Sequence, residues 1–157
     1  MENKASDVVL RKSLVSDVKP IHSMLLGTAR DGLLLPRPLG DLYRHIREFY
    51  VLEQNGQVVG CCALAIIWDN LAEIRSLVVT EELRGKYLGQ KLVEACLSEA
   101  VALGLSQVFT LTYQDAFFGK LGFRVVQKEV LPNKVWADCI NCPKFPDCDE
   151  IAMLIDL

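Results

Sequence analysis

The spacing of hydrophobic residues predicts two helices in the first third of the chain. Apolar side chains recur at near-helical intervals through residues 16–26, where Ser16 can cap the first turn. A shorter helix begins at about Asp41, after a connection at 27–40 that contains glycine and proline. A short apolar run at 8–11 precedes both helices and predicts a first strand.

A hairpin follows the second helix. Two apolar runs, 50–52 and 58–68, lie on either side of Asn55-Gly56. This dipeptide accepts the two positive φ angles of a tight hairpin turn. A turn at Asp69-Asn70 leads into a further strand, 72–80. The run 58–68 has eleven residues, whereas a helix needs about 20 apolar residues to span a bilayer, so we interpret it as a buried strand.

Helical and strand patterns alternate in the second half of the chain. The longest segment carries apolar residues at helical spacing and stops at Gly104, which predicts a long amphipathic helix. The predicted elements are helices at 86–103 and 115–121, strands at 107–111, 123–131 and 151–157, and an irregular segment at 132–149. This order predicts one α/β domain over residues 1–157, with a mixed central sheet of about seven strands and helices on both faces.

The composition narrows the class of protein. Apolar residues make up 51% and charged residues 24% of the chain, which excludes an intrinsically disordered protein. The net charge of −3 lacks the basic excess with which proteins usually bind nucleic acid. The six cysteines occur without a secretory signal, so we expect a reduced, cytoplasmic protein with no nucleic-acid partner and no membrane partner.

The start of the long helix has the features of an anion-binding turn. A buried strand ends at about Thr80, and a loop with Arg84, Gly85, Lys86 and Gly89 then opens the helix. The first N–H groups of a helix have no intrahelical partner and lie at the positive end of the helix dipole, so a diphosphate fits there. The alternative is an ordinary strand-turn-helix with solvated basic residues, because glycine-rich helix starts are common.

Two segments resemble the GNAT family of acetyl-CoA-dependent N-acetyltransferases. Residues 84–89 resemble the family fingerprint of Gln or Arg, two residues, Gly, one residue, and Gly or Ala, although Tyr87 stands where glycine is usual. Residues 117–123 resemble the family's FYEKLGF segment. The resemblance covers nearly the whole chain and implies a GNAT-like fold with acetyl-CoA as co-substrate. It implies these cofactor-binding residues: Leu77, Val78, Val79, Arg84, Gly85, Lys86, Tyr87, Leu88, Gly89 and Phe118.

Acetyl transfer to an amine needs a base, because an amine is protonated at neutral pH. Glu73 lies where many GNAT enzymes carry a base glutamate, so the resemblance makes it the candidate base; the alternative is an ion pair with Arg75 or another cation. A bulge in this strand would free N–H groups of 77–79 for the acetyl and pantetheine portions. The family's usual acid, a tyrosine, is replaced by Phe118, so water could return the proton. Transfer is direct, without a cysteine nucleophile.

Within the family the chain resembles the short, stand-alone N-acetylglutamate synthases of arginine biosynthesis. The similar segments are residues 32–37, 41–49 and 134–146. The resemblance implies that the acceptor is L-glutamate, whose two carboxylates need at least two cations. The candidate substrate-binding residues are Arg37, Arg75 and Lys134.

Four alternatives to a glutamate acetyltransferase stay open. They are a GNAT acetyltransferase for another small amine, one for a protein N-terminus, a CoA-binding regulator without turnover, and a metal or thiol sensor built on this fold. The partners that we expect are a small-molecule amino acid and CoA, and the resemblance leaves a homodimer open.

A cysteine-rich segment lies near the C-terminus. Cys139 and Cys142 have the spacing of zinc ligands and Cys148 follows, but a structural zinc site needs four ligands. Metal binding, packing beside Trp136 and Phe145, and redox regulation are all open, and we assign no metal site.

Overall fold

The computed structural model describes residues 7–30, 37–132 and 149–157. The strands are β1 (Val9–Lys12), β2 (Phe49–Gln54), β3 (Gln57–Trp68), β4 (Leu71–Val79), β5 (Gln107–Thr112), β6 (Arg124–Val126) and β7 (Ile151–Asp156). The α-helices are α1 (Val18–Arg30), α2 (Leu39–His45), α3 (Leu88–Ala102) and α4 (Asp115–Lys120). Short 3-10 turns lie at Val15–Asp17, Ile46–Glu48, Glu81–Leu83 and Lys128–Val130.

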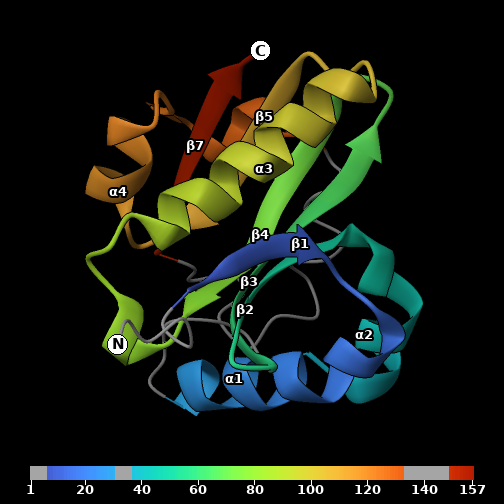
Figure 1. The fold of residues 1–157 in the computed structure, drawn as a ribbon. Coiled ribbons are helices and arrows are strands. Elements are labelled where there is room, and N and C mark those ends of the chain that lie inside the picture. The colour runs from blue at the N-terminus through green and yellow to red at the C-terminus, as the bar shows by residue number, and fades with distance from the viewer. Residues whose placement is uncertain (1–6, 31–36, 133–148) are drawn as a thin grey trace.

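The strands form one mixed sheet of seven in the order β1-β2-β3-β4-β5-β7-β6 (Figure 1). Neighbouring strands are antiparallel except β4 and β5, which run parallel. A core cluster that contains Leu92 and Cys96 of α3 and Phe118 of α4 fills one face of the sheet. A second cluster, with Ile21 of α1 and Leu42 of α2, fills the other face. The predicted mixed α/β sheet with helices on both faces is therefore confirmed.

Local sequence signals account for several element boundaries. Asn55 and Gly56 have φ angles of 55° and 76°, as the predicted hairpin turn between β2 and β3 requires. α1 continues through Gly27 to Arg30, past its predicted end, because a single glycine costs a helix only about 1 kcal/mol. α3 begins at Leu88 instead of Lys86 because Tyr87 adopts a left-handed conformation. β6 is shorter than predicted, since the chain turns at Lys128–Val130.

The parallel pair β4 and β5 separates soon after it begins. Its register joins Leu71, Ala72 and Glu73 to residues of β5 and stops there. Farther along β4, Cys61 and Ala63 of β3 pair with Val78 and Arg75 of β4. One residue lies between these pairs on β3 and two lie between them on β4, so β4 contains one extra residue. This β-bulge includes Ser76, whose φ is 58°. The separation and the bulge leave the second half of β4 without a β5 partner in the described register.

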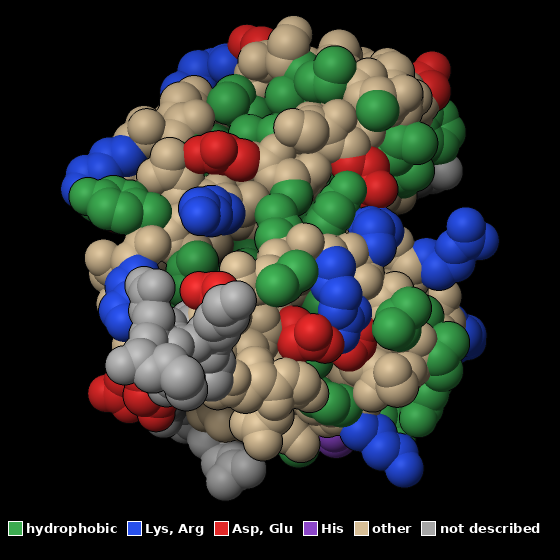
Figure 2. Space-filling model, viewed as in Figure 1, with side chains coloured by type: hydrophobic (Ala, Val, Ile, Leu, Met, Phe, Trp, Pro, Cys, Tyr) green, Lys and Arg blue, Asp and Glu red, His purple; other side chains and the backbone are tan. Residues whose placement is uncertain are grey.

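The described surface mixes charges of both signs. On the face shown in Figure 2, Lys and Arg side chains are interspersed with Asp and Glu, and hydrophobic side chains lie between them. Among the described residues, no helix is both long and apolar enough to cross a membrane.

Candidate active site

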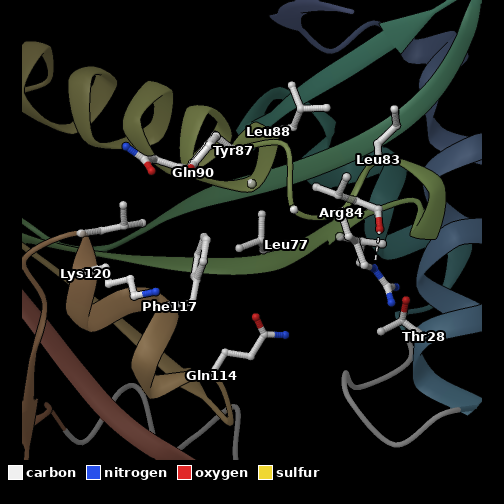
Figure 3. Close-up of a pocket in the computed structure, with 15 residues that line it drawn as sticks. Thr28, Leu77, Leu83, Arg84, Tyr87, Leu88, Gln90, Gln114, Phe117 and Lys120 are labelled. Carbon is white, nitrogen blue, oxygen red and sulfur yellow. Dashed lines mark hydrogen bonds between the residues drawn. The ribbon is translucent and has the colours of Figure 1, made fainter.

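A cavity of about 510 Å³ lies between the separated part of β4, the start of α3, and α4 (Figure 3). β4 contributes residues 77–79, the loop before α3 contributes 83–85, and the helix start contributes 87–90. The remaining lining residues are Thr28 at the end of α1, and Gln114, Phe117, Lys120 and Leu121 at and near α4. The structure thus brings together eight of the ten predicted cofactor-binding residues; Lys86 and Phe118 are not among the residues that line the cavity.

The start of α3 presents backbone N–H groups at the cavity. Tyr87 is the N-cap, with φ 62° and ψ 14°, and no side chain caps the helix. Lys91 N–H donates to the Tyr87 carbonyl at 3.1 Å, so the amides of Leu88, Gly89 and Gln90 precede the first helical donor and have no intrahelical acceptor. Together with the dipole of a 15-residue helix, they make this end of the cavity attractive to an anion.

The loop before α3 is held by glycine geometry and by one arginine. Gly85 has φ 79°, a conformation that glycine adopts without steric cost. Arg84 Nε donates to the Val79 carbonyl at 3.1 Å, and its guanidinium extends toward Thr28 in Figure 3. A Cβ at Gly89 would lie 3.5 Å from Cζ of Phe117, an ordinary van der Waals distance, so α3 lies next to Phe117 of α4 at this position. Gly85 and Arg84 therefore fix the shape of this loop.

Glu73 and Arg75 form an ion pair on β4. Arg75 donates to Glu73 Oε1 from Nε at 3.1 Å and from Nη2 at 2.5 Å. Their side chains are 13% and 29% exposed. Both residues alternate with Ile74, which packs in the core beneath α3, so their side chains point to the opposite face, where α1 and α2 pack. The ion pair that the sequence left as an alternative is present.

Arg37 lies against the bulge of β4. Its Nε donates to Asp41 Oδ2 at 2.9 Å and its Nη1 donates to Ser76 Oγ at 3.1 Å. The guanidinium also lies over the ring of Phe49, 5.4 Å from the centroid, and the side chain is 11% exposed. The structure therefore places two of the three predicted substrate-binding cations at β4: Arg75 within it and Arg37 against it. The third, Lys134, lies outside the described residues.

The acetyltransferase (GNAT) domain family matches residues 45–125. This match covers more than half of the chain and includes the β4 bulge, the start of α3 and α4. The chain is a GNAT acetyltransferase.

Two curated relatives of this GNAT acetyltransferase are similar over most of their own length. An N-acetyltransferase of Chlorobaculum tepidum is 43% identical over 150 residues, which cover 96% of this chain and 97% of that protein. The amino-acid acetyltransferase of Mycobacterium tuberculosis is 37% identical over 122 residues, which cover 76% and 70% of the two chains. The protein is thus an N-acetyltransferase related to amino-acid acetyltransferases, and its family membership makes acetyl-CoA the co-substrate.

Solved structures agree with this assignment. The structure of Rv2747 from Mycobacterium tuberculosis in complex with CoA has a TM-score of 0.80 and 31% identity, and the match covers 95% of this chain and 99% of that chain. N-acetylglutamate synthase from Neisseria gonorrhoeae, complexed with coenzyme A and L-arginine, has a TM-score of 0.78 and 26% identity. That match covers 96% of this chain and 33% of the synthase, so this GNAT chain spans about a third of the longer protein.

Phe118 is not placed at the cavity in this GNAT acetyltransferase. Its ring is buried, 3% exposed, and packs edge-to-face against Phe117 at 5.0 Å and Phe123 at 5.2 Å. Its neighbour Phe117 lines the cavity instead. Three further lining residues were not predicted from the sequence. Thr28 lies on α1, Gln114 is the N-cap of α4, and Lys120 lies on α4. Phe117 could have been found from the FYEKLGF-like segment, but no local signal marks Thr28.

The described cysteines are buried thiols. Burial raises the pKa of Cys61 to about 12, and a hydrogen bond with Cys96, together with burial, raises the pKa of Cys62. These thiols are protonated at neutral pH and are poor nucleophiles. Cys139, Cys142 and Cys148 lie outside the described residues, and the described part of the chain contains no cluster of three or more His, Cys, Asp or Glu that could hold a metal.

Proposed function

We propose that this GNAT acetyltransferase transfers the acetyl group of acetyl-CoA to the α-amine of L-glutamate. Such an enzyme would serve arginine biosynthesis in the cytoplasm, and we expect no nucleic-acid partner. The observation that carries the proposal is the cavity between the β4 bulge and the start of α3, with Glu73, Arg75 and Arg37 on the same strand or against it. Relatives named amino-acid acetyltransferase and N-acetylglutamate synthase support it.

The cavity suits the two chemical parts of CoA. We assign the diphosphate to the unpaired amides of 88–90, with Gly85 and Arg84 beside them, because a helix start and a guanidinium both attract phosphate. We assign the pantetheine arm to the backbone of 77–79, where β5 no longer pairs with β4, and to the ring of Phe117. Lys86 is exposed beside this loop and adds positive charge near the phosphates.

Glu73 acts as the base in this proposal. The ammonium of the acceptor gives its proton to the Glu73 carboxylate, and the freed nitrogen then attacks the thioester carbonyl carbon. As the C–N bond forms, the C–S bond breaks and its electron pair leaves on sulfur. Phe118 has no hydroxyl and is buried, and Tyr113 donates its hydroxyl to Asp149 at 2.7 Å. The proton that sulfur takes up therefore comes from water.

The acceptor's carboxylates are assigned to arginines at β4. A guanidinium has five N–H donors, and the bonds of Arg37 to Asp41 and Ser76 engage two of them, which leaves donors for a carboxylate. Arg75 can bind the second carboxylate of the acceptor, and this carboxylate then competes with Glu73 for the Arg75 guanidinium. Lys134 is the third candidate. An acceptor without carboxylates gains none of these contacts, so we expect strong preference for an acidic amino acid.

The proposal is tested by assaying acetyl-CoA with a panel of amines and detecting the released thiol. The panel contains glutamate, aspartate, glutamine, a polyamine and a peptide with a free N-terminus. We expect glutamate to give the highest kcat/KM, and glutamine, which differs in one charge, to be at least tenfold poorer. Activity confined to the polyamine or the peptide would contradict the proposed acceptor.

Light scattering on the same sample tests whether the protein is a homodimer.

A further inference from the structure

We infer that Ser76 and Arg37 are positioning residues, which together hold the bulge of β4 in the shape that presents residues 77–79 to the thioester. This inference rests on the proposed assignment of the cavity to acetyl-CoA. Neither side chain lines the cavity. Ser76 acts through the backbone that does, and Arg37 acts on the same backbone through Ser76, in addition to the carboxylate contact proposed for it above.

Ser76 has a backbone conformation that its residue type disfavours. Its φ of 58° lies in the left-handed region, which glycine occupies readily and other residues rarely do. Glycine is common at this kind of position in β-bulges. Ser76 is also buried, with 8% of its surface exposed, so its hydroxyl must find a partner inside the protein. A strained, buried serine where glycine would fit indicates that the hydroxyl has a use.

Two contacts from different elements hold this residue. The hydroxyl of Ser76 accepts a hydrogen bond from Nη1 of Arg37 at 3.1 Å. Its carbonyl accepts one from the thiol of Cys61 on β3 at 3.3 Å. Arg37 is fixed in turn by Asp41 on α2 and by the ring of Phe49 on β2. The bulge is therefore tied to the layer of α1 and α2, on the side of the sheet away from α3.

The bulge decides which side chains of β4 face the cavity. Before it, Ile74 packs in the core beneath α3; after it, Val78 packs in the core beneath α1 and α2. Leu77 and Val79 consequently turn toward α3 and the cavity. A one-residue change of register sends every following side chain to the opposite face. Without the extra residue, the backbone groups assigned to the acetyl and pantetheine portions would be aimed differently.

Two substitutions at position 76 separate positioning from stability. Ser76→Gly removes the hydroxyl and also the strain, whereas Ser76→Ala removes the hydroxyl and keeps the strain. We expect both variants to lose about tenfold in kcat at saturating substrates, although the melting temperature of Ser76→Gly is equal to or above that of the wild type. The Kd for CoA, held mainly by the start of α3, should change less than threefold in both. Ser106→Ala is the control for the loss of a hydrogen-bonded serine hydroxyl, because Ser106 donates its hydroxyl to the Asn70 carbonyl at 3.3 Å and does not line the cavity.

A double-variant cycle tests whether Arg37 works through Ser76. Arg37→Lys replaces the guanidinium, whose Nε and Nη1 donate to Asp41 and Ser76, with a single ammonium group that cannot reproduce this geometry. If the two residues act as one pair, adding Ser76→Gly to Arg37→Lys should lower kcat less than threefold further. Wild-type kcat in both Ser76 variants, or losses that multiply in the double variant, would overturn the inference.

Failure of the proposed function gives a different result. Kinetic constants are compared with whichever amine the wild-type protein accepts, so a different acceptor leaves this test intact. If the wild type does not bind CoA in calorimetry, the assignment of the cavity fails before any variant is made.

Discussion

Tyr87 lies at the N-cap of α3 in a left-handed conformation, and its side chain is 76% exposed. This conformation costs a non-glycine residue about 1–2 kcal/mol, and glycine has an entropic cost of about 0.5–1 kcal/mol. We therefore expect Tyr87→Gly to raise the free energy of unfolding by up to about 1 kcal/mol, measured by urea denaturation. Tyr43→Gly is the control: Tyr43 is an exposed residue of α2, where glycine should lower stability because it is a poorer helix former than tyrosine. A loss of stability in Tyr87→Gly would show that the tyrosine side chain has a stabilising contact.

Glu73 is the residue on which the proposed chemistry depends most. Removal of a general base typically slows a reaction by about 10²–10⁴-fold. Glu73→Gln should lower kcat in this range, because glutamine cannot accept the proton, while CoA still binds in calorimetry. Glu73→Gln also removes the ion pair with Arg75. Glu82→Gln, at an exposed glutamate before α3, is the control for the removal of one negative charge away from Glu73. Activity of Glu73→Gln within tenfold of the wild type would rule out Glu73 as the base.

At the scale of elements, Asp17 fastens the start of α1 to the edge of the sheet. It is buried and accepts two hydrogen bonds from Arg11 of β1, at 2.8 and 3.0 Å, and one from Leu14 N–H at 2.7 Å. Burial raises the pKa of Asp17, but the hydrogen bonds from Arg11 and Leu14 outweigh burial, and the pKa is lowered. A carboxyl whose pKa is lower in the folded state than in the unfolded state stabilises the protein fully at pH values above its unfolded-state pKa. This contribution is lost as the pH falls through the folded-state pKa.

Asp17→Asn should therefore destabilise the protein by about 1.5–3 kcal/mol near pH 7, since hydrogen bonds to a charged group are lost. The difference between the wild type and the variant should shrink as the pH falls below about 4, the ordinary pKa of aspartate. Urea denaturation at several pH values measures both curves. A difference that does not depend on pH would mean that shape, not charge, makes Asp17 important.

At the scale of the whole molecule, the cavity joins elements from both halves of the chain. Thr28 comes from α1, residues 77–79 from β4, and Phe117 and Lys120 from α4. A ligand that binds only when these elements are assembled stabilises the folded state by about 2.7 kcal/mol at 100 times its Kd. We expect CoA to raise the melting temperature accordingly. Pantetheine, which lacks the diphosphate, should raise it much less at the same concentration. No shift with CoA would contradict the assignment of the cavity.

The sequence predicted features that depend on neighbouring residues. Asn55-Gly56 set the hairpin, and the loop with Gly85 and Gly89 marked the start of α3, because turn conformations are decided locally. The fold class followed from the order of such elements, and the family followed from the resemblance of residues 84–89 and 117–123 to GNAT segments. The place of the bulge could not be predicted, since Ser76 is not a typical residue for a positive φ. That Phe117 and Thr28 line the cavity and Phe118 does not could not be predicted, because contact with the cavity depends on how distant elements pack.

The parting of β4 and β5 has a kinetic consequence. Residues 77–79 meet the cavity on the α3 side, whereas the side chains of Glu73 and Arg75 point to the other side of the sheet. With the acceptor beside Glu73 and Arg75, as proposed, donor and acceptor lie on opposite sides of the sheet and can occupy the protein together, in a ternary complex. Each product then occupies the place of its own precursor, so CoA should compete with acetyl-CoA alone, and the acetylated product with the free acceptor alone.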